Sequence, residues 1–521
     1  CRHDGTVLLS DLVATSAAVS ATRSRTAKRE LLAAAVRQCA AAEVEVVVAY
    51  LSGEVRQRRT GVGWRSLADE VTPATDATLT VLEVDAALEQ LAVLAGAGSQ
   101  AARRAAVAEL FGRATAPEQA FLRGLLTGEI RQGALDGVVL DALAPSLDVP
   151  ADQVRRAAML LGSTAAAAGL ARRAGADGLA AVRLEVGRPV RPMLSASAPD
   201  VTSALARVTP AGPVVVDTKL DGIRLQLHKD GEQVLVVTRS LDDITARVPE
   251  VVERVRQLPA RSLVLDGEAL ALRPDGRPQP FQITAARTAT GADVEAMRRR
   301  TPLTTVLFDL LHHDGDDLLG APLTDRAERL AGLLSGSASD LLVPRITTSD
   351  VAVAQRFFDD AVAAGHEGVV AKASDAPYAA GRRGSAWVKV KPRHTLDLVV
   401  LAAEWGSGRR VGWLSNLHLG ARARTGGEGF IMLGKTFKGL TDELLSWQTE
   451  QLLAREVRRT RHVVHVRPEL VVEIAFDGVQ TSSRYPGGVA LRFARVLRYR
   501  DDKTADQADS LDSVLAVHNP G

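Results

Sequence analysis

Helical spacing of apolar residues dominates the first part of the chain, up to about residue 185. Segments 30–36 (ELLAAAV) and 154–161 (VRRAAMLL) repeat Leu, Ala, Val or Met at the three- and four-residue intervals that form one face of a helix. No fixed-period repeat is present. The run GRPVRP at 187–192 then interrupts the helical pattern and indicates a linker. We therefore expect an all-α domain over residues 1–190.

The pattern changes to short strands and tight turns from about residue 200. Ile223–His228 alternates apolar and polar residues, the run KDG at 229–231 supplies a turn, and Gln233–Val237 returns as the second strand of a hairpin. Helices lie between the strands, and we expect one of them to be capped near Thr324. This mixture predicts an α+β domain over residues 191–395.

The last zone is rich in strands separated by glycine-containing turns. It predicts a small β-barrel over residues 396–510, followed by a short tail at 511–521. One segment, 429–436 (GFIMLGKT), also fits the spacing of a phosphate-binding P-loop. Its four middle residues are Phe, Ile, Met and Leu, which favour a buried strand over a flexible loop. We interpret the match as coincidental and place the segment on a strand of the barrel.

Composition adds the class of protein and of partner. The chain has 521 residues, 46% of them hydrophobic and 24% charged, which is typical of a globular protein of about three domains. The net charge is only +2, but basic residues clearly outnumber acidic ones from Arg382 to Lys438, which indicates a surface that faces a polyanion. Neither a spanning apolar run nor a secretory signal is visible, so we expect a soluble cytoplasmic protein that does not bind membranes.

The rarity of lysine directs attention to Lys219. Only nine of the 64 basic residues are lysines, so arginine provides most generic positive charge. An amine can lose its proton and act as a nucleophile, which a guanidinium does not do. Lys219 directly follows the strand-like run VVVDT and precedes Leu220-Asp221-Gly222. This position predicts a reactive lysine at the end of a strand.

Further charged residues follow other apolar runs. Asp266-Gly267-Glu268 comes after LVL, Phe308-Asp309 comes after TVL, Glu367-Gly368 precedes VVAK, and the strand-like run WVKVK contains Lys389 and Lys391. We expect these residues at strand ends. Each feature alone is weak, but together they place carboxylates and amines around one lysine. Such a set suits a nucleoside triphosphate with a divalent metal.

In this order the runs resemble the covalent nucleotidyltransferase superfamily and, within it, the ATP-dependent DNA ligases that carry an N-terminal helical DNA-binding domain. The resemblance is strong over about residues 190–510, and GEIRQG at 128–133 and RPML at 191–194 are also similar to the family. The departures are Ala494, where the family often has Pro, and Asp217, where it often has Glu. The similar segments are KLDGIR at 219–224, Arg239-Ser240, Asp266–Glu268, Phe308-Asp309, Glu367-Gly368, Lys389–Lys391 and RFARVLRYRDDK at 492–503.

The resemblance implies a multidomain fold: an all-α DNA-binding domain, an α+β nucleotidyltransferase (ATP-grasp-like) domain and a C-terminal OB-fold β-barrel. It implies that Lys219 attacks ATP to form a lysyl–AMP, that AMP passes to the 5′-phosphate of nicked double-stranded DNA, and that the 3′-hydroxyl then displaces AMP. The implied cofactors are ATP and Mg²⁺. We expect a monomer associated with the nucleoid, acting in DNA replication, recombination or repair.

The resemblance also implies individual roles. Lys219 is the nucleophile, and Glu268 and Glu367 are the metal ligands. Arg492 and Lys503 orient pyrophosphate, and Lys435 and Lys438 contact the DNA backbone. In ATP binding, Asp217 and Phe308 would hold the adenine and Arg239 and Glu268 the ribose, and the phosphates would be bound by Arg224, Arg383, Lys389 and Lys391.

Three kinds of alternative remain at this point. An RNA ligase or an RNA-capping enzyme shares the nucleotidyl-transfer motifs, although the long helical zone favours duplex DNA. A P-loop ATPase would use the segment 429–436, and a catalytically inactive DNA-binding protein would lack some of the motif residues that this chain retains. An NAD-dependent ligase is disfavoured, because Cys1 and Cys39 are too few for its zinc site.

Overall fold

The structure, a computed structural model, describes residues 6–57, 60–96, 98–133, 136–208, 212–289, 293–379, 383–424 and 427–518, with the side chains at 65, 383–385 and 518 excepted. Its contacts group the chain into two compact units. The first contains residues 1–196, 205–350 and 370–388, and the second contains 197–204, 351–369 and 389–521. Each unit is described by itself below.

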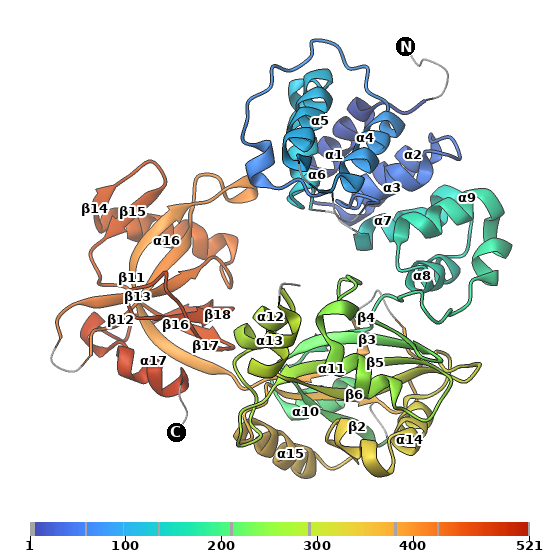
Figure 1. The fold of residues 1–521 in the computed structure, drawn as a ribbon. Helices are drawn as coiled ribbons and strands as arrows, with labels where there is room; N and C mark the ends of the chain where they lie inside the picture. Colours follow the sequence, from blue (N-terminus) through green and yellow to red (C-terminus); the bar gives the residue numbers. More distant parts are fainter. Residues whose placement is uncertain are drawn as a thin grey trace. The chain divides into compact units, whose positions relative to one another are not determined.

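The first part of unit 1 is helical, as the apolar spacing predicts (Figure 1). Thr80 and Glu83 form a capping box at the start of α4, in which the Glu83 amide donates to the Thr80 hydroxyl at 3.2 Å and the Thr80 amide donates to the Glu83 carboxylate at 2.9 Å. Buried leucines, valines and alanines from these helices form one apolar core. The helices are α1 (Leu9–Ala21), α2 (Arg25–Arg37), α3 (Val44–Leu51), α4 (Val81–Val93), α5 (Ser99–Arg113), α6 (Ala116–Leu126), α7 (Asp136–Leu147), α8 (Ala151–Leu160) and α9 (Thr164–Ala181).

Two five-stranded sheets form the middle of the chain. The first has the order β1-β10-β9-β2-β8 and the second the order β4-β3-β5-β6-β7. The expected hairpin is present as β3 and β4, paired antiparallel from Leu225–Thr238 to Asp230–Gln233. The strands are β1 (Leu194–Ser197), β2 (Val214–Lys219), β3 (Ile223–Asp230), β4 (Gln233–Thr238), β5 (Ser262–Ala271), β6 (Leu303–His313), β7 (Asp316–Asp317), β8 (Arg345–Thr348), β9 (Gly368–Ala373) and β10 (Arg383–Val390).

The expectation that acidic residues end two of these strands is wrong. Asp266 and Glu268 lie inside β5, and Asp309 lies inside β6. Both aspartates are fully buried, and arginines pair with them: Arg224 with Asp266 at 2.6 Å and Arg326 with Asp309 at 2.7 Å. Because each buried charge has a partner, the strands continue through these positions, with irregular pairing on either side of Leu265 and Asp266.

Helices accompany the sheets of the middle region. The helix expected to be capped near Thr324 is present as α14 (Leu323–Leu333), but its N-cap is Pro322 and not Thr324. The Thr324 hydroxyl lies within hydrogen-bond distance of the Ser374 carbonyl, at 3.3 Å, and of the Asp325 carboxylate, at 3.4 Å. The helices are α10 (Val201–Val208), α11 (Pro249–Arg256), α12 (Phe281–Ala289), α13 (Val294–Arg300), α14 (Leu323–Leu333) and α15 (Val351–Ala363).

The C-terminal region is rich in strands, coloured orange to red in Figure 1. Its sheet follows the order β13-β12-β11-β15-β14, with β16 pairing with β11 and β19, and β17 pairs with β18. Buried residues such as Leu398, Leu417 and Val472 form its apolar core. The elements are β11 (His394–Trp405), β12 (Leu414–Arg422), β13 (Phe430–Thr436), α16 (Asp442–Ala454), β14 (Glu456–Arg459), β15 (Val463–Val466), β16 (Val471–Phe476), β17 (Gly478–Thr481), β18 (Val489–Arg492), β19 (Arg495–Tyr499) and α17 (Leu511–His518).

The P-loop alternative fails on this topology. Residues 430–436 form β13, which pairs antiparallel with β12 from Leu417–Thr436 to Arg422–Phe430. Leu433 is fully buried in the core of the C-terminal region. A paired strand cannot wrap its amides around a phosphate. The prediction of a strand at this segment is confirmed. Within the described ranges, no helix has the length and apolar character needed to cross a membrane.

Candidate nucleotide-binding active site

Lys219 stands where the sequence places it, at the end of β2. The five preceding residues of the strand are buried and Lys219 is half-buried, so the amine emerges from the sheet at its edge. Its Nζ lies 3.2 Å from the Leu220 carbonyl oxygen. The next turn needs a glycine, because a Cβ at Gly222 would lie 2.4 Å from the Ala269 carbonyl oxygen. The nucleophile candidate is thus held between a buried strand and a tightly packed turn.

Glu268 ties this turn to the second sheet. Its Oε1 accepts a hydrogen bond from the Gly222 amide at 2.7 Å. In the pairing of β3 with β5, Glu268 lies directly opposite Arg224. The carboxylate that is expected to bind ribose and metal therefore contacts the turn that directly follows Lys219.

Asp217 forms the centre of a buried ion cluster. It is 2% exposed, and its carboxylate pairs with Arg345 (Nε–Oδ1, 2.5 Å) and with Lys372 (Nζ–Oδ2, 2.5 Å). Burial raises the pKa of Asp217, but the two neighbouring cations outweigh it and hold that pKa below its ordinary value. Burial has the opposite consequence for Lys372, whose pKa is lowered despite the attraction of Asp217. The cluster carries one negative and two positive groups.

Aromatic rings surround the amine of Lys372. Its Nζ lies 4.7 Å from the ring centroid of Phe308 and 4.2 Å from that of Trp387. The two rings meet edge to face, with centroids 6.1 Å apart and planes at 78°. A cation over a ring face is attracted by the ring quadrupole. Phe308, the expected adenine-stacking residue, thus lies in a wall of aromatic and cationic groups that also holds Asp217.

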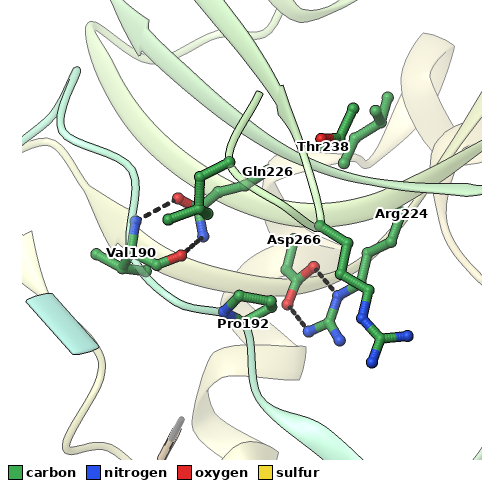
Figure 2. A pocket seen from close by; sticks show the side chains of 9 residues that line it. Val190, Pro192, Arg224, Gln226, Thr238 and Asp266 are labelled. Carbon is green, nitrogen blue, oxygen red and sulfur yellow. Dashed lines mark hydrogen bonds and ion pairs between the residues drawn. The ribbon is translucent and has the colours of Figure 1, made fainter. Parts of the chain in front are cut away.

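Arg224 belongs to a second buried network. Its guanidinium forms a bidentate ion pair with the Asp266 carboxylate, with Nε–Oδ1 at 2.9 Å and Nη2–Oδ2 at 2.6 Å. Its Nη1 donates to the Met193 carbonyl at 2.6 Å. The Tyr378 hydroxyl donates to Asp266 at 2.7 Å and accepts from the Met193 amide at 3.0 Å. Figure 2 shows Arg224 facing Asp266 in this arrangement. Arg224 therefore joins three segments that are distant in sequence.

Arg239 lines a small hollow beside this network. Arg224, Arg239, Thr238 and Asp266 are among the residues that line it. On its other side, the side chain of Gln226 exchanges two hydrogen bonds with the backbone of Val190, at 2.8 Å and 3.1 Å (Figure 2). Arg239 itself is exposed on the turn after β4. Its expected contact with ribose stays a prediction.

Three further expected ligands of ATP and metal, Glu367, Lys389 and Lys391, fall in unit 2. The carboxylate of Glu367 pairs with the amine of Lys391 at 2.8 Å and lies 3.9 Å from the guanidinium of Arg492. Gly368 follows with φ 128°, and a Cβ there would lie 2.2 Å from the Val390 carbonyl oxygen, so only glycine lets Glu367 stand so close to the end of β10. Lys389 is half-buried on that strand.

The other cations predicted in the C-terminal region have particular neighbours. Lys503 pairs with Asp397 at 2.6 Å. Lys435 pairs with Glu404, which also accepts from His418 at 3.0 Å. Lys438 is exposed, and its amine lies 5.3 Å from the ring centroid of Phe493. The side chain of Arg383, predicted to bind phosphate, lies outside the described residues.

Sequence reasoning assigned no role to several residues of unit 1, namely Arg345, Lys372, Tyr378 and Trp387. Lys372 had a signal, since it is one of only nine lysines. The others had none, because an arginine or tyrosine acquires its role from a partner that lies far along the chain. Asp217 and Arg345, for example, are 128 residues apart.

Comparisons with known proteins match most of the chain. The family model described as the ATP dependent DNA ligase domain matches residues 192–391. Models of the C-terminal region of ATP dependent DNA ligases and of the DNA ligase N terminus match residues 410–503 and 65–144. A relative named "Probable DNA ligase" from Nocardioides sp. is 61% identical over 98% of this chain and 99% of its own length. The chain belongs to the ATP-dependent DNA ligase family.

A second relative agrees with membership of the ligase family, and a solved structure agrees with the fold. A "Probable DNA ligase" from Beutenbergia cavernae is 61% identical, over 98% of this chain and 99% of its own length. The solved structure "Pmar-Lig_PreS3" is similar to this chain with a TM-score of 0.61, over 94% of this chain and 99% of its own. The two sequences are 17% identical, so this likeness supports the fold alone. The expected fold class is confirmed: a helical N-terminal region, a nucleotidyltransferase domain and a strand-rich C-terminal domain. The expected enzyme class, an ATP-dependent DNA ligase, is confirmed as well.

Proposed function

We propose that this ligase seals nicks in double-stranded DNA through a lysyl–AMP at Lys219. The observation that carries the proposal is the placement of this amine at the end of a buried strand, with Glu268 bound to the turn that follows. In the first step the neutral amine attacks the α-phosphorus of ATP. A bond forms between the Lys219 nitrogen and the α-phosphorus, and the bond between the α-phosphorus and the oxygen that bridges to the β-phosphate breaks. Pyrophosphate leaves, and the amine loses a proton.

The second and third steps use DNA. The 5′-phosphate of the nick attacks the phosphorus of the lysyl–AMP, so AMP passes to DNA and Lys219 is regenerated. The 3′-hydroxyl then attacks the adenylated 5′-phosphate, a phosphodiester bond forms and AMP leaves. The protein must position each phosphate and stabilise the charge that develops on its oxygens. Arg224, Arg383, Lys389 and Lys391 are the proposed contacts for the phosphates of ATP.

For nucleotide recognition, we assign the adenine to the wall formed by Phe308 and Asp217. Both oxygens of Asp217 already accept from Arg345, and Oδ2 also accepts from Lys372. A carboxylate offers about four lone-pair sites, so a site on Oδ1 is left to accept from the adenine amino group. Glu268 and Arg239 are the proposed ribose contacts.

Mg²⁺ is the proposed cofactor, and Glu268 and Glu367 would hold it. Among the described residues, no three His, Cys, Asp or Glu side chains gather as a metal site. Two carboxylates, Glu268 and Glu367, are enough for a Mg²⁺ ion that is shared with a triphosphate, because this ion is usually bound by one or two carboxylates together with phosphate oxygens and water. When bound, it would neutralise charge on the phosphates. Lys391, which pairs with Glu367, would have to share that carboxylate or release it.

For the wider context, we propose that the chain acts as a monomer in the cytoplasm, on nicked duplex DNA of the nucleoid. Replication, recombination and repair are the typical settings of the family. The three domains are proposed at residues 1–190, 191–395 and 396–510, with a tail at 511–521. Lys435 and Lys438 are the proposed backbone contacts of the C-terminal domain, and Arg492 and Lys503 the proposed contacts of pyrophosphate.

The experiment that tests the proposal follows the covalent intermediate. The protein is incubated with α-labelled ATP and Mg²⁺, denatured and separated by electrophoresis, with α-labelled GTP and NAD in parallel. Wild-type protein should carry label from ATP, and both Lys219→Ala and Lys219→Arg should carry none, because a guanidinium stays protonated. Undiminished labelling of Lys219→Ala would refute the assignment. Nicked DNA and nicked RNA, offered next, separate a DNA ligase from an RNA ligase.

A further inference from the structure

We propose that Asp397 is a positioning residue for the first step, because it holds the Lys503 ammonium at one point for the pyrophosphate leaving group. The inference rests on the proposed role of Lys503. Neither the motifs nor the apolar pattern singles out Asp397, which lies near the start of β11.

The backbone of Asp397 is fixed from two sides. Its amide donates to the side chain of Asp509 at 2.7 Å, and its carbonyl accepts from the Asp509 amide at 2.8 Å. On the other side, β11 pairs with β16, which places Asp397 opposite Glu473. Asp397 is 7% exposed. The carboxylate therefore projects from a rigid, buried point of the sheet.

One oxygen of this carboxylate holds two cations. Oδ2 accepts from Lys503 Nζ at 2.6 Å and from Arg500 Nη1 at 2.8 Å. Arg500 has a second partner in Asp502, through two contacts of 2.8 Å and 2.7 Å. Among the described residues, Asp397 is the only carboxylate within ion-pair distance of Lys503. The position of the ammonium therefore depends on Asp397 far more than that of the guanidinium does.

The other oxygen of the Asp397 carboxylate takes no part in these ion pairs. Asp397 Oδ1 is buried and has no hydrogen-bond partner among the described residues. Both ion-pair contacts of this carboxylate therefore run through Oδ2. The carboxylate directs this oxygen at Lys503 and Arg500.

Lys503 keeps the capacity to bind an anion. An ammonium has three N–H donors, and Asp397 accepts one of them. The Lys503 side chain is 32% exposed, so the ammonium can reach a phosphate while Asp397 holds it. Without this partner the Lys503 side chain would sample many rotamers. Ordering it in the transition state would then cost conformational entropy and raise the barrier of the first step.

The test compares two steps of the reaction in Asp397→Asn, which keeps the shape and removes the charge. The rate of lysyl–AMP formation at saturating ATP should fall about 10- to 100-fold, the range expected when a reacting group is misplaced by about an ångström. The KM for ATP should change little. Sealing of a nick that already carries AMP on its 5′-phosphate should stay at the wild-type rate, since that step releases no pyrophosphate.

A matched control comes from the same row of the sheet. Glu473 lies opposite Asp397 and pairs with Arg498 at 2.7 Å, so Glu473→Gln removes a neighbouring carboxylate from a more exposed ion pair of the same sheet. It should leave both rates unchanged. Lys503→Ala should reproduce the loss seen in Asp397→Asn, and the double variant should be no slower than Lys503→Ala alone.

Other outcomes overturn the inference. Equal losses in both steps with a lower melting temperature would make Asp397 a structural residue, and additive losses in the double variant would show that it does not act through Lys503. If Lys503→Ala formed lysyl–AMP at the wild-type rate, the inference would fall while the lysyl–AMP mechanism stood. Absence of the adduct from wild-type protein would instead refute the proposed function itself.

Discussion

The buried ion cluster of Asp217 allows a quantitative prediction, because its charges do not balance. Asp217→Asn would leave Lys372 and Arg345 without their shared carboxylate, with Lys372 only 3% exposed and Arg345 13% exposed. Breaking a buried ion pair by removing one partner costs about 3–5 kcal/mol. We expect the variant to lose stability of that order in the sheet that contains β2 and β8.

The loss should depend on pH in a defined direction. Burial already lowers the pKa of Lys372, and removal of Asp217 lowers it further. A lysine with a depressed pKa in the folded state binds a proton on unfolding. The variant is therefore least stable at low pH and regains stability as the pH rises through the folded-state pKa of Lys372.

The assay is hydrogen–deuterium exchange of peptides that cover β2, measured between pH 6 and pH 9. A second substitution, Lys372→Met, supplies the rescue, because Met keeps an unbranched chain between Phe308 and Trp387 without the like charge. Asp217→Asn with Lys372→Met should recover more than half of the loss. A loss below about 1 kcal/mol in the single variant, or no recovery in the double one, would refute the account of Asp217 as the shared counter-ion of Lys372 and Arg345.

Three further predictions follow from the geometry. Gly222→Ala would bring a Cβ to within 2.4 Å of the Ala269 carbonyl oxygen and should slow lysyl–AMP formation about 100-fold. Gly320→Ala is the control, because Gly320 has no atom within 4 Å of its missing Cβ and no positive φ; equal rates in the two variants would contradict the tight turn. Glu404, whose pKa is lowered to about 2 against burial by hydrogen bonds from Lys435 and His418, should stabilise the C-terminal domain above about pH 4.5 and lose this contribution as the pH falls toward 2. Glu404→Gln should flatten that acid titration in circular dichroism, and an unchanged titration would assign it to other carboxylates. Lys438→Ala should weaken nick binding and lower by about one the slope of log affinity against log salt concentration. Lys435→Ala should change this slope less, because Glu404 already neutralises the charge of Lys435. Filter binding across a KCl series compares the two variants, and equal slopes would show that the ion pair with Glu404 has no influence.

Local pattern was enough for much of the fold. The helices up to residue 181, the β3–β4 hairpin and the strand at 430–436 all follow from the spacing of apolar residues and from turn residues within a few positions. Lys219 was identifiable for a similar reason, since an amine in a lysine-poor chain stands next to a recognisable strand and turn. These features depend on neighbours that are close in sequence.

Tertiary structure decided where charge is buried and what neutralises it. Asp266 and Asp309 lie within strands because Arg224 and Arg326 reach them from other elements. Asp217 meets Arg345 and Lys372, and Asp397 meets Lys503, only because strand pairing brings together positions more than a hundred residues apart. Sequence spacing carries no information about such pairs. A charged residue enters the interior only where the folded chain places a partner within a few ångströms, and that distance is set by strand register and packing.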